Sequence, residues 1–121
     1  MTPTHSGAID CDIHPGVPAI KALLPYMNEF WRESFVARGL DGFDMVSYPL
    51  GAPITCRPDW RDKGWRPGSD LAHMQRHALD AFGIELAICN PMTGGQVVVS
   101  ESMGAAICSA VNDWVVEHWQ S

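Results

Sequence analysis

Apolar and polar residues alternate along the stretch IDCDIHPG, residues 9–16. In an extended strand successive side chains point to opposite faces, so the isoleucines and the cysteine share one face. Asp10, Asp12 and His14 share the other face. The pattern predicts a strand over residues 8–14 that ends before the Pro-Gly pair, with one apolar face and one face able to bind an ion.

Helical periodicity follows the strand. Residues 17–36 predict a helix in two pieces, the second opened by Pro25, and Gly39 stands where that helix should end. Later in the chain Ser69 is a good N-cap. The order of strand, helix, insert, helix, strand and helix is that of an α/β fold. The remaining elements are a helix over 69–82, a strand over 84–89 and a helix over 101–119.

The stretch 39–68 differs from the rest, because it holds five Gly and four Pro. No long periodic element fits there, so we expect an insert of the kind that compact domains keep as a lid, a binding loop or an oligomer contact. It also concentrates half of the chain's basic residues beside Trp60 and Trp65. Arg57 and Arg61 could clamp a substrate carboxylate. Arg and Trp also anchor subunit interfaces, which on composition alone favours a solvated or subunit-facing loop.

The composition places residues 1–121 in one globular domain, since 46% of the residues are hydrophobic and five are Trp. A formal charge of −6 opposes binding to phosphate backbones, so nucleic acid is not an expected partner. No signal peptide is evident and no apolar run approaches the ~20 residues that cross a bilayer. We expect a cytoplasmic protein that does not engage membranes. Its four cysteines form no CxxC pair and are expected as reduced thiols.

Two parallel strands are too few to make a sheet covered on both faces, which is what a parallel sheet normally requires. The chain is therefore expected to be part of a larger fold. We expect the 121 residues on their own to expose a large apolar surface and to self-associate.

The motif Ile-Asp-x-Asp-x-His at residues 9–14, followed by two prolines, resembles the amidohydrolase-related family that includes aminocarboxymuconate-semialdehyde decarboxylase. Four further stretches carry the resemblance over nearly the whole chain: LLPYMNEFWRE, PGSDLAHM, FGIELAICNP and AAICSAVNDWVVEHW. Members are metal-dependent (β/α)8 barrels. The resemblance implies a partial TIM barrel, its first two βα units, with the insert 39–68 after the first strand.

In such a barrel the ends of the strands hold the active site, and the resemblance implies that Asp12 and His14 share a divalent ion. The family usually has histidine at both positions, and an aspartate at the first admits manganese as well as zinc. Asp10 would orient these ligands. The alternative is a strand with a solvated polar face, which any alternating strand can present.

Other candidate residues lie outside this strand. Asn90 opens the loop NPMTGGQ after the second predicted strand and could contact substrate, as could Arg57 and Arg61. His73 and His77 form an HxxxH on a predicted helix, but they lack the Glu that a zinc protease places beside the first His. A solvated or interface role is favoured for this pair.

The resemblance implies a metal-dependent hydrolase or decarboxylase acting on a small organic acid or amide. The remaining metal ligands and the catalytic residues are expected beyond these 121 residues, so the chain alone should be a poor catalyst. The alternative is a non-catalytic fragment that works by association. Its partner would be a complementary chain or a second copy in a homo-oligomer.

Overall fold

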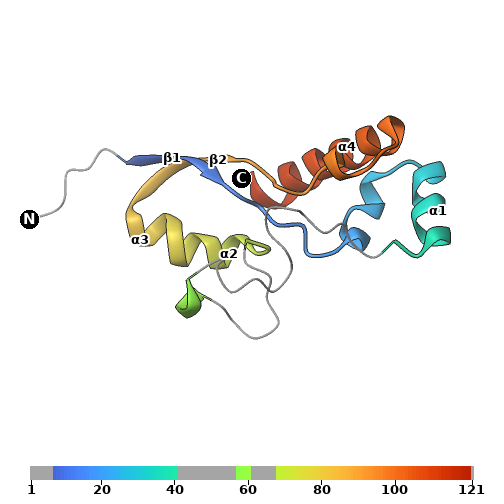
Figure 1. Cartoon of the computed structure of the whole chain (residues 1–121). Coiled ribbons are helices and arrows are strands. Elements are labelled where there is room, and N and C mark those ends of the chain that lie inside the picture. The colour runs from blue at the N-terminus through green and yellow to red at the C-terminus, as the bar shows by residue number, and fades with distance from the viewer. Residues whose placement is uncertain (1–6, 41–56, 61–67, 121) are drawn as a thin grey trace, which may run out of the picture.

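The computed structural model describes residues 7–40, 57–60 and 68–120, and helices and strands alternate along them (Figure 1). The elements are β1 (Ala8–Ile13), η1 (Ile20–Ala22), η2 (Leu24–Tyr26), α1 (Glu29–Arg38), η3 (Pro58–Trp60), α2 (Leu71–Met74), η4 (Gln75–Leu79), α3 (Asp80–Phe82), β2 (Ile84–Cys89), η5 (Gly95–Val97) and α4 (Glu101–Trp119). The element η4 is a π-helical turn that joins α2 to α3, and the other η elements are 3-10 turns. No described helix is long and apolar enough to cross a membrane.

Several boundaries follow the sequence pattern closely. The structure confirms β2 and α4 residue for residue, and it ends α1 and α3 at Gly39 and Gly83. Both glycines have φ near +60°, at 61° and 62°, a conformation that costs glycine little because it has no Cβ.

Two predicted helix starts are wrong. Pro25 does not open the second helical piece, because it lies inside η2, and Asn28 caps α1 by accepting the N–H of Trp31. The helix predicted from Ser69 begins at Leu71, because Asp70 is extended and its carboxylate accepts the N–H of His73 at 2.8 Å.

The strands β1 and β2 pair in parallel, with Ile9 opposite Leu86, Asp10 opposite Ala87 and Ile13 opposite Cys89. Between the last two pairs β1 advances three residues and β2 only two, so β1 carries one extra residue. Such a bulge reverses the alternation of side chains beyond it.

Strict alternation along β1 is therefore a wrong prediction. The bulge turns Ile13 to the face that carries Asp10, whereas Ile9 and Cys11 stay on the other. Burial follows the same division, since Ile13 is buried and both Ile9 and Cys11 are exposed.

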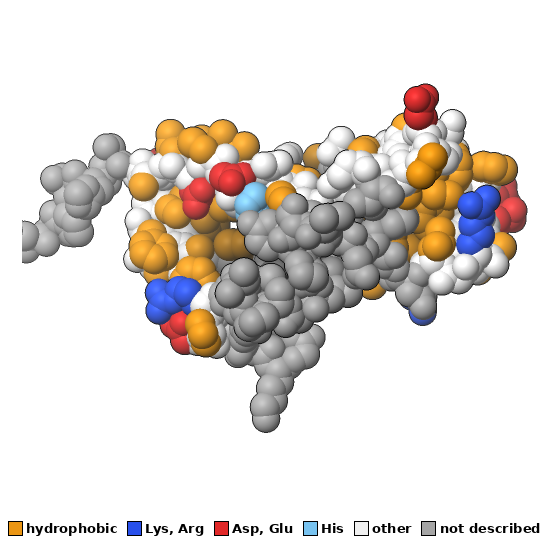
Figure 2. Space-filling model, viewed as in Figure 1, with side chains coloured by type: hydrophobic (Ala, Val, Ile, Leu, Met, Phe, Trp, Pro, Cys, Tyr) orange, Lys and Arg blue, Asp and Glu red, His pale blue; other side chains and the backbone are white. Residues whose placement is uncertain are grey.

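The sheet thus has a covered face and an open face. The covered face carries Asp10, Ile13, Ala87 and Cys89, and its apolar members pack against the hydrophobic core. The open face carries Ile9 at 60% exposure, Leu86 at 58% and Ile88 at 52%. Figure 2 shows hydrophobic side chains gathered over the strands, with acidic groups and a histidine beside them.

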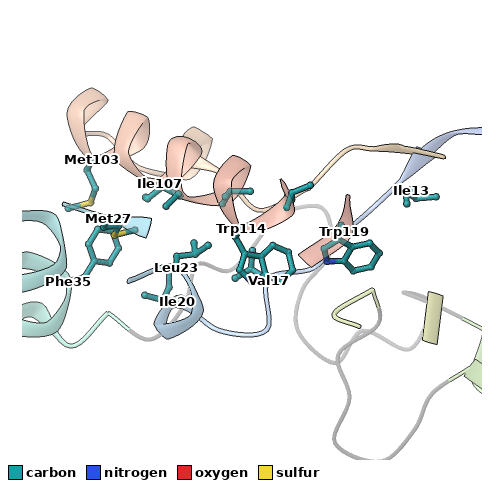
Figure 3. Packing of buried hydrophobic residues seen from close by; sticks show 13 residues of the cluster. Ile13, Val17, Ile20, Leu23, Met27, Phe35, Met103, Ile107, Trp114 and Trp119 are labelled. Atoms are coloured by element: carbon teal, nitrogen blue, oxygen red, sulfur yellow. The ribbon is translucent and has the colours of Figure 1, made fainter. Parts of the chain in front are cut away.

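The hydrophobic core lies at the other end of the molecule, between α4 and the segment that runs from β1 to α1 (Figure 3). Side chains of η1, η2 and α1 meet one side of α4 there. The buried residues are Ile13, Val17, Ile20, Leu23, Met27, Phe35, Met103, Ile107, Ala110, Val111, Trp114, Val115 and Trp119. Of this cluster only Ile13 comes from a strand, so the core ends where the sheet begins.

Candidate functional site

Three polar residues meet where the two strands end. Asp12 lies in β1 just before its last residue, His14 follows the last residue of β1, and Asn90 follows the last residue of β2. Because the strands are parallel, their carboxyl ends lie side by side. The N–H of Asn90 donates to the carbonyl oxygen of Ile13 at 2.7 Å, which carries the pairing one residue past the end of β2. The fold therefore brings together residues that are more than seventy positions apart in sequence.

His14 and Asp12 point to the same side of the sheet. Ile13, between them, lies on the covered face, so its two neighbours lie on the open face with Ile9 and Leu86. His14 Nε2 is 3.4 Å from Asp12 Oδ2. The predicted meeting of these two side chains is thus present in the structure, at the carboxyl end of the open face.

The tautomer of His14 follows from its hydrogen bond to Asn90. His14 Nδ1 lies 2.9 Å from the backbone carbonyl oxygen of Asn90. A carbonyl oxygen only accepts, so Nδ1 carries the hydrogen and Nε2 faces Asp12. A histidine that binds a metal commonly donates its other ring N–H to a backbone carbonyl in this way.

The spacing of the two facing atoms fits a shared divalent ion. With Zn–N and Zn–O bonds of about 2.0 to 2.2 Å in tetrahedral geometry, two ligand atoms stand about 3.4 Å apart. His14 Nε2 and Asp12 Oδ2 are separated by 3.4 Å, and both side chains are open to solvent, at 38% and 63% exposure. An imidazole nitrogen and a carboxylate oxygen suit zinc, and the carboxylate also suits manganese.

The pair supplies two ligand atoms. Among the described residues no group of three or more His, Cys, Asp or Glu side chains gathers around one point. Asp10 takes another part, because its Oδ1 accepts the backbone N–H of Asp12 at 3.0 Å. This contact fixes the backbone at the bulge from which the Asp12 carboxylate extends.

Arg57, a predicted substrate ligand, has its guanidinium engaged by its own segment. Its Nε and Nη2 donate to the two carboxylate oxygens of Asp59 at 3.0 and 2.7 Å. The hydrogen bond lowers the pKa of Asp59 and raises that of Arg57. The guanidinium also lies over the Trp60 ring, 5.0 Å from its centroid. Arg61, the other predicted clamp, lies outside the described residues.

Trp60 links this part of the insert to the helical segment before β2. Its ring stacks on His77 with centroids 5.9 Å apart, and His77 meets His73 edge to face at 5.8 Å. The HxxxH pair therefore contacts an aromatic ring of the insert. Sequence reasoning missed this contact, although Trp60 and the histidine pair were each noticed.

Gly68 is a second feature that the sequence pattern did not reveal. Its φ is +75°, and a Cβ built there would stand 2.5 Å from the carbonyl oxygen of His14. Its own carbonyl oxygen accepts the N–H of Gly16 at 2.6 Å. The chain thus returns from the insert directly over the loop that follows His14. The Pro-Gly pair at 67–68 is the only sequence signal of this turn.

No protein-family model matches the chain, and no curated protein matches it.

Proposed function

We propose that this chain forms the first two βα units of an amidohydrolase-like (β/α)8 barrel, and that Asp12 and His14 hold its divalent ion. The complete enzyme is a metal-dependent hydrolase or decarboxylase that acts on a small organic acid or amide. One observation carries the proposal: a carboxylate and an imidazole stand 3.4 Å apart at the carboxyl ends of two parallel strands. That is where barrel enzymes place their active sites.

The two faces of the sheet support the barrel. The interior of such a barrel is filled by layers of branched apolar side chains, and helices cover the outside. The open face presents Ile9, Leu86 and Ile88 in this manner, and the covered face packs against the helical core. In the proposed barrel the open face is the interior, and the metal pair lies at its mouth.

When bound, a zinc or manganese ion polarises a carbonyl group or lowers the pKa of a bound water. The residues of this chain hold the two donor atoms in place for it. The backbone carbonyl of Asn90 accepts the Nδ1–H of His14, which turns Nε2 toward the Asp12 carboxylate. Catalytic zinc sites have three protein ligands, so the proposal requires at least one more from the other units of the barrel.

The substrate contacts remain part of the proposal. Arg57 meets Asp59 through Nε and Nη2, so a substrate carboxylate would have to share the guanidinium with Asp59 or replace it. Arg61 and Asn90 are the other proposed contacts. A cytoplasmic location belongs to the same proposal, and the free thiols of Cys11, Cys89 and Cys108 support it.

A second candidate function is association without catalysis. The exposed apolar side chains of the open face favour it, because contiguous apolar surface commonly marks a protein interface. The partner would be a complementary chain or a second copy of this one. Metal binding separates the two candidates, since association alone does not require His14 and Asp12 to bind an ion.

Isothermal titration of the chain with Zn²⁺, and separately with Mn²⁺, tests the enzyme proposal. We expect weak binding to the wild-type chain, and none over the same range of metal concentrations to Asp12→Ala or His14→Ala. His73→Ala is the matched control, since it removes an imidazole from outside the strand ends and should leave binding unchanged. Equal loss in His73→Ala and His14→Ala would place the ion on the helix. Absence of binding by the wild-type chain would remove the metal proposal.

A further inference from the structure

We propose that Asn90 is the positioning residue of the metal pair, and this inference rests on the proposed metal-binding function. Asn90 makes hydrogen bonds to three consecutive residues of the first strand end. Its backbone N–H donates to Ile13, its carbonyl oxygen accepts from His14, and its side-chain Nδ2 donates to Asp12. One residue from the second strand end thus holds both proposed ligands.

The contact with Asp12 determines which carboxylate oxygen meets His14. Asn90 Nδ2 lies 2.9 Å from Asp12 Oδ1, and Asp12 Oδ2 is the oxygen that faces His14 Nε2. A carboxylate only accepts hydrogen bonds, so the amide must turn its NH₂ group toward Asp12. The hydrogen bond therefore holds the carboxylate by one oxygen and aims the other at the proposed ion.

The contact with His14 determines which ring nitrogen faces Asp12. The carbonyl oxygen of Asn90 accepts a hydrogen bond from Nδ1–H, which turns Nε2 toward Asp12. Groups that orient metal ligands in this way typically change metal affinity by about 10- to 100-fold when they are removed. The side chain and the backbone of Asn90 each hold one ligand, so they can be tested separately.

Substitution of Asn90 removes only the side-chain contact. Asn90→Ala keeps the carbonyl that binds His14 and the N–H that binds Ile13, and it loses the donor to Asp12. Because the Asn90 side chain is exposed, the variant leaves no unpaired group in the core. Asn90→Leu keeps the volume of the side chain without its donor. We expect either variant to lower the affinity for Zn²⁺ by about 10- to 100-fold.

A double-mutant cycle tests whether Asn90 changes the affinity for Zn²⁺ through its contact with Asp12. The four proteins are the wild type, Asn90→Ala, Asp12→Ala and the double variant, each titrated with Zn²⁺ at concentrations high enough to detect binding to His14 alone. If Asn90 acts through Asp12, its substitution changes nothing further once Asp12 is alanine. Nitrogen-15 spectra of His14 in the metal-free proteins should show the Nδ1–H tautomer in both the wild type and Asn90→Ala.

The matched control is Gln96→Ala. Gln96 is an exposed amide in the same loop, and its Nε2 donates to the carbonyl oxygen of Met92 at 3.1 Å, away from both ligands. We expect Zn²⁺ affinity to be unchanged in this variant. An equal loss in Gln96→Ala and Asn90→Ala would assign the effect to the loop as a whole and overturn the inference.

The remaining outcomes separate this inference from the proposed function. If Asn90→Ala weakens binding just as much in the Asp12→Ala background, Asn90 is itself a ligand and not a positioning residue. If the wild type binds Zn²⁺ and neither Asn90 variant weakens it, the metal site stands and the positioning role falls. If the wild type binds no Zn²⁺, the metal function and the inference fall together.

Discussion

The two ends of this molecule differ in how they are packed. At one end α4 meets η1, η2 and α1 over a continuous cluster of buried side chains. At the other end the sheet and the helical segment of residues 71–82 contribute only Ile13 to the buried set of the described residues. We call these the packed end and the sheet end. The packed end holds most of the buried hydrophobic side chains, and the sheet end holds the proposed metal pair.

The site lies at the junction of the two ends. Ile13 is buried at 6% exposure and belongs to the core cluster, and its two neighbours in sequence are the proposed ligands. The core thus anchors the backbone between Asp12 and His14. Beyond them the open face has no cover among the described residues, since Leu86 and Ile88 are more than half exposed. This contrast teaches that a polar pair anchored by the core can border an apolar face that the described residues leave exposed.

The largest expected effect concerns association of the sheet end. We expect the wild-type chain to self-associate through the open face at micromolar concentration, because water otherwise contacts that apolar surface. Replacing Ile9, Leu86 and Ile88 together by Thr keeps strand propensity and removes most of that surface. Light scattering coupled to gel filtration should show the variant shifted to monomer.

The control for that experiment lies at the packed end. Val36 and Val116 are also exposed, at 65% and 55%, but they stand on helices α1 and α4. Their joint replacement by Thr should leave the association state unchanged. A stable monomeric wild type would contradict the comparison, because the open face would then need no partner.

Core truncation should give the next largest effect. Leu23 is fully buried at 0% exposure, so Leu23→Ala is expected to lower the free energy of unfolding by about 2 to 5 kcal/mol. Leu86 is 58% exposed, and Leu86→Ala is expected to cost less than about 1 kcal/mol. Urea unfolding followed by tryptophan fluorescence measures both, in a background that carries Ile9→Thr and Ile88→Thr to weaken association and keeps Leu86. Equal losses would show that the open face is covered in solution.

Substitution of Gly68 tests how the insert meets the site. An alanine at Gly39 or Gly83 is expected to lower the free energy of unfolding by about 1 to 2 kcal/mol. The loss comes from the left-handed backbone alone, since a Cβ there meets open space. Gly68→Ala has the same backbone strain, and its Cβ is also forced against the carbonyl oxygen of His14. We expect the largest loss of unfolding free energy in Gly68→Ala, by urea titration of the three variants. If Gly68→Ala loses no more unfolding free energy than Gly83→Ala, the backbone near His14 can shift to make room for the added Cβ.

Much of the secondary structure could be predicted from the sequence, for physical reasons that differ by element. The hydrophobic residues of the strand β2 and the helix α4 recur with a clear period, and both elements have clear ends in the sequence. Their limits were therefore predicted correctly. The bulge in β1 was not predicted, because an extra residue in a strand depends on its partner's register. The start of α1 was misplaced because Pro25 suits a 3-10 turn as well as a first helical turn.

The candidate site divides in a similar way. The meeting of Asp12 and His14 follows from their spacing of two, because Ile13 between them lies on the covered face and leaves both of its neighbours on the open face. The nearness of Asn90 follows from parallel pairing, but its hydrogen bonds to both ligands depend on atomic positions that no spacing rule gives. The ion pair between Arg57 and Asp59 could not be predicted from their spacing of two. They lie at a 3-10 turn and not in a strand, so their side chains do not alternate with a fixed period.

The smallest expected effect is a pH dependence at the packed end. Tyr26 of η2 donates its hydroxyl to Glu117 Oε2 of α4 at 2.7 Å, and this hydrogen bond, followed by burial, raises the pKa of Tyr26 from its ordinary value of 10.0. A group whose pKa is raised by folding stabilises the protein below its unfolded-state pKa. That contribution is lost as the pH rises through the folded-state value, because the ionised phenolate repels the Glu117 carboxylate.

The urea midpoint of the wild type should therefore exceed that of Tyr26→Phe near neutral pH, and the difference should shrink above about pH 10. Comparison with the Phe variant cancels the titration of other groups, which both proteins share. Glu117→Gln is the control: it removes the carboxylate that raises the Tyr26 pKa, so the decline above about pH 10 should be smaller in that background. A difference between the wild type and Tyr26→Phe that stays constant across this range would mean that Tyr26 does not donate a hydrogen bond to Glu117 in solution.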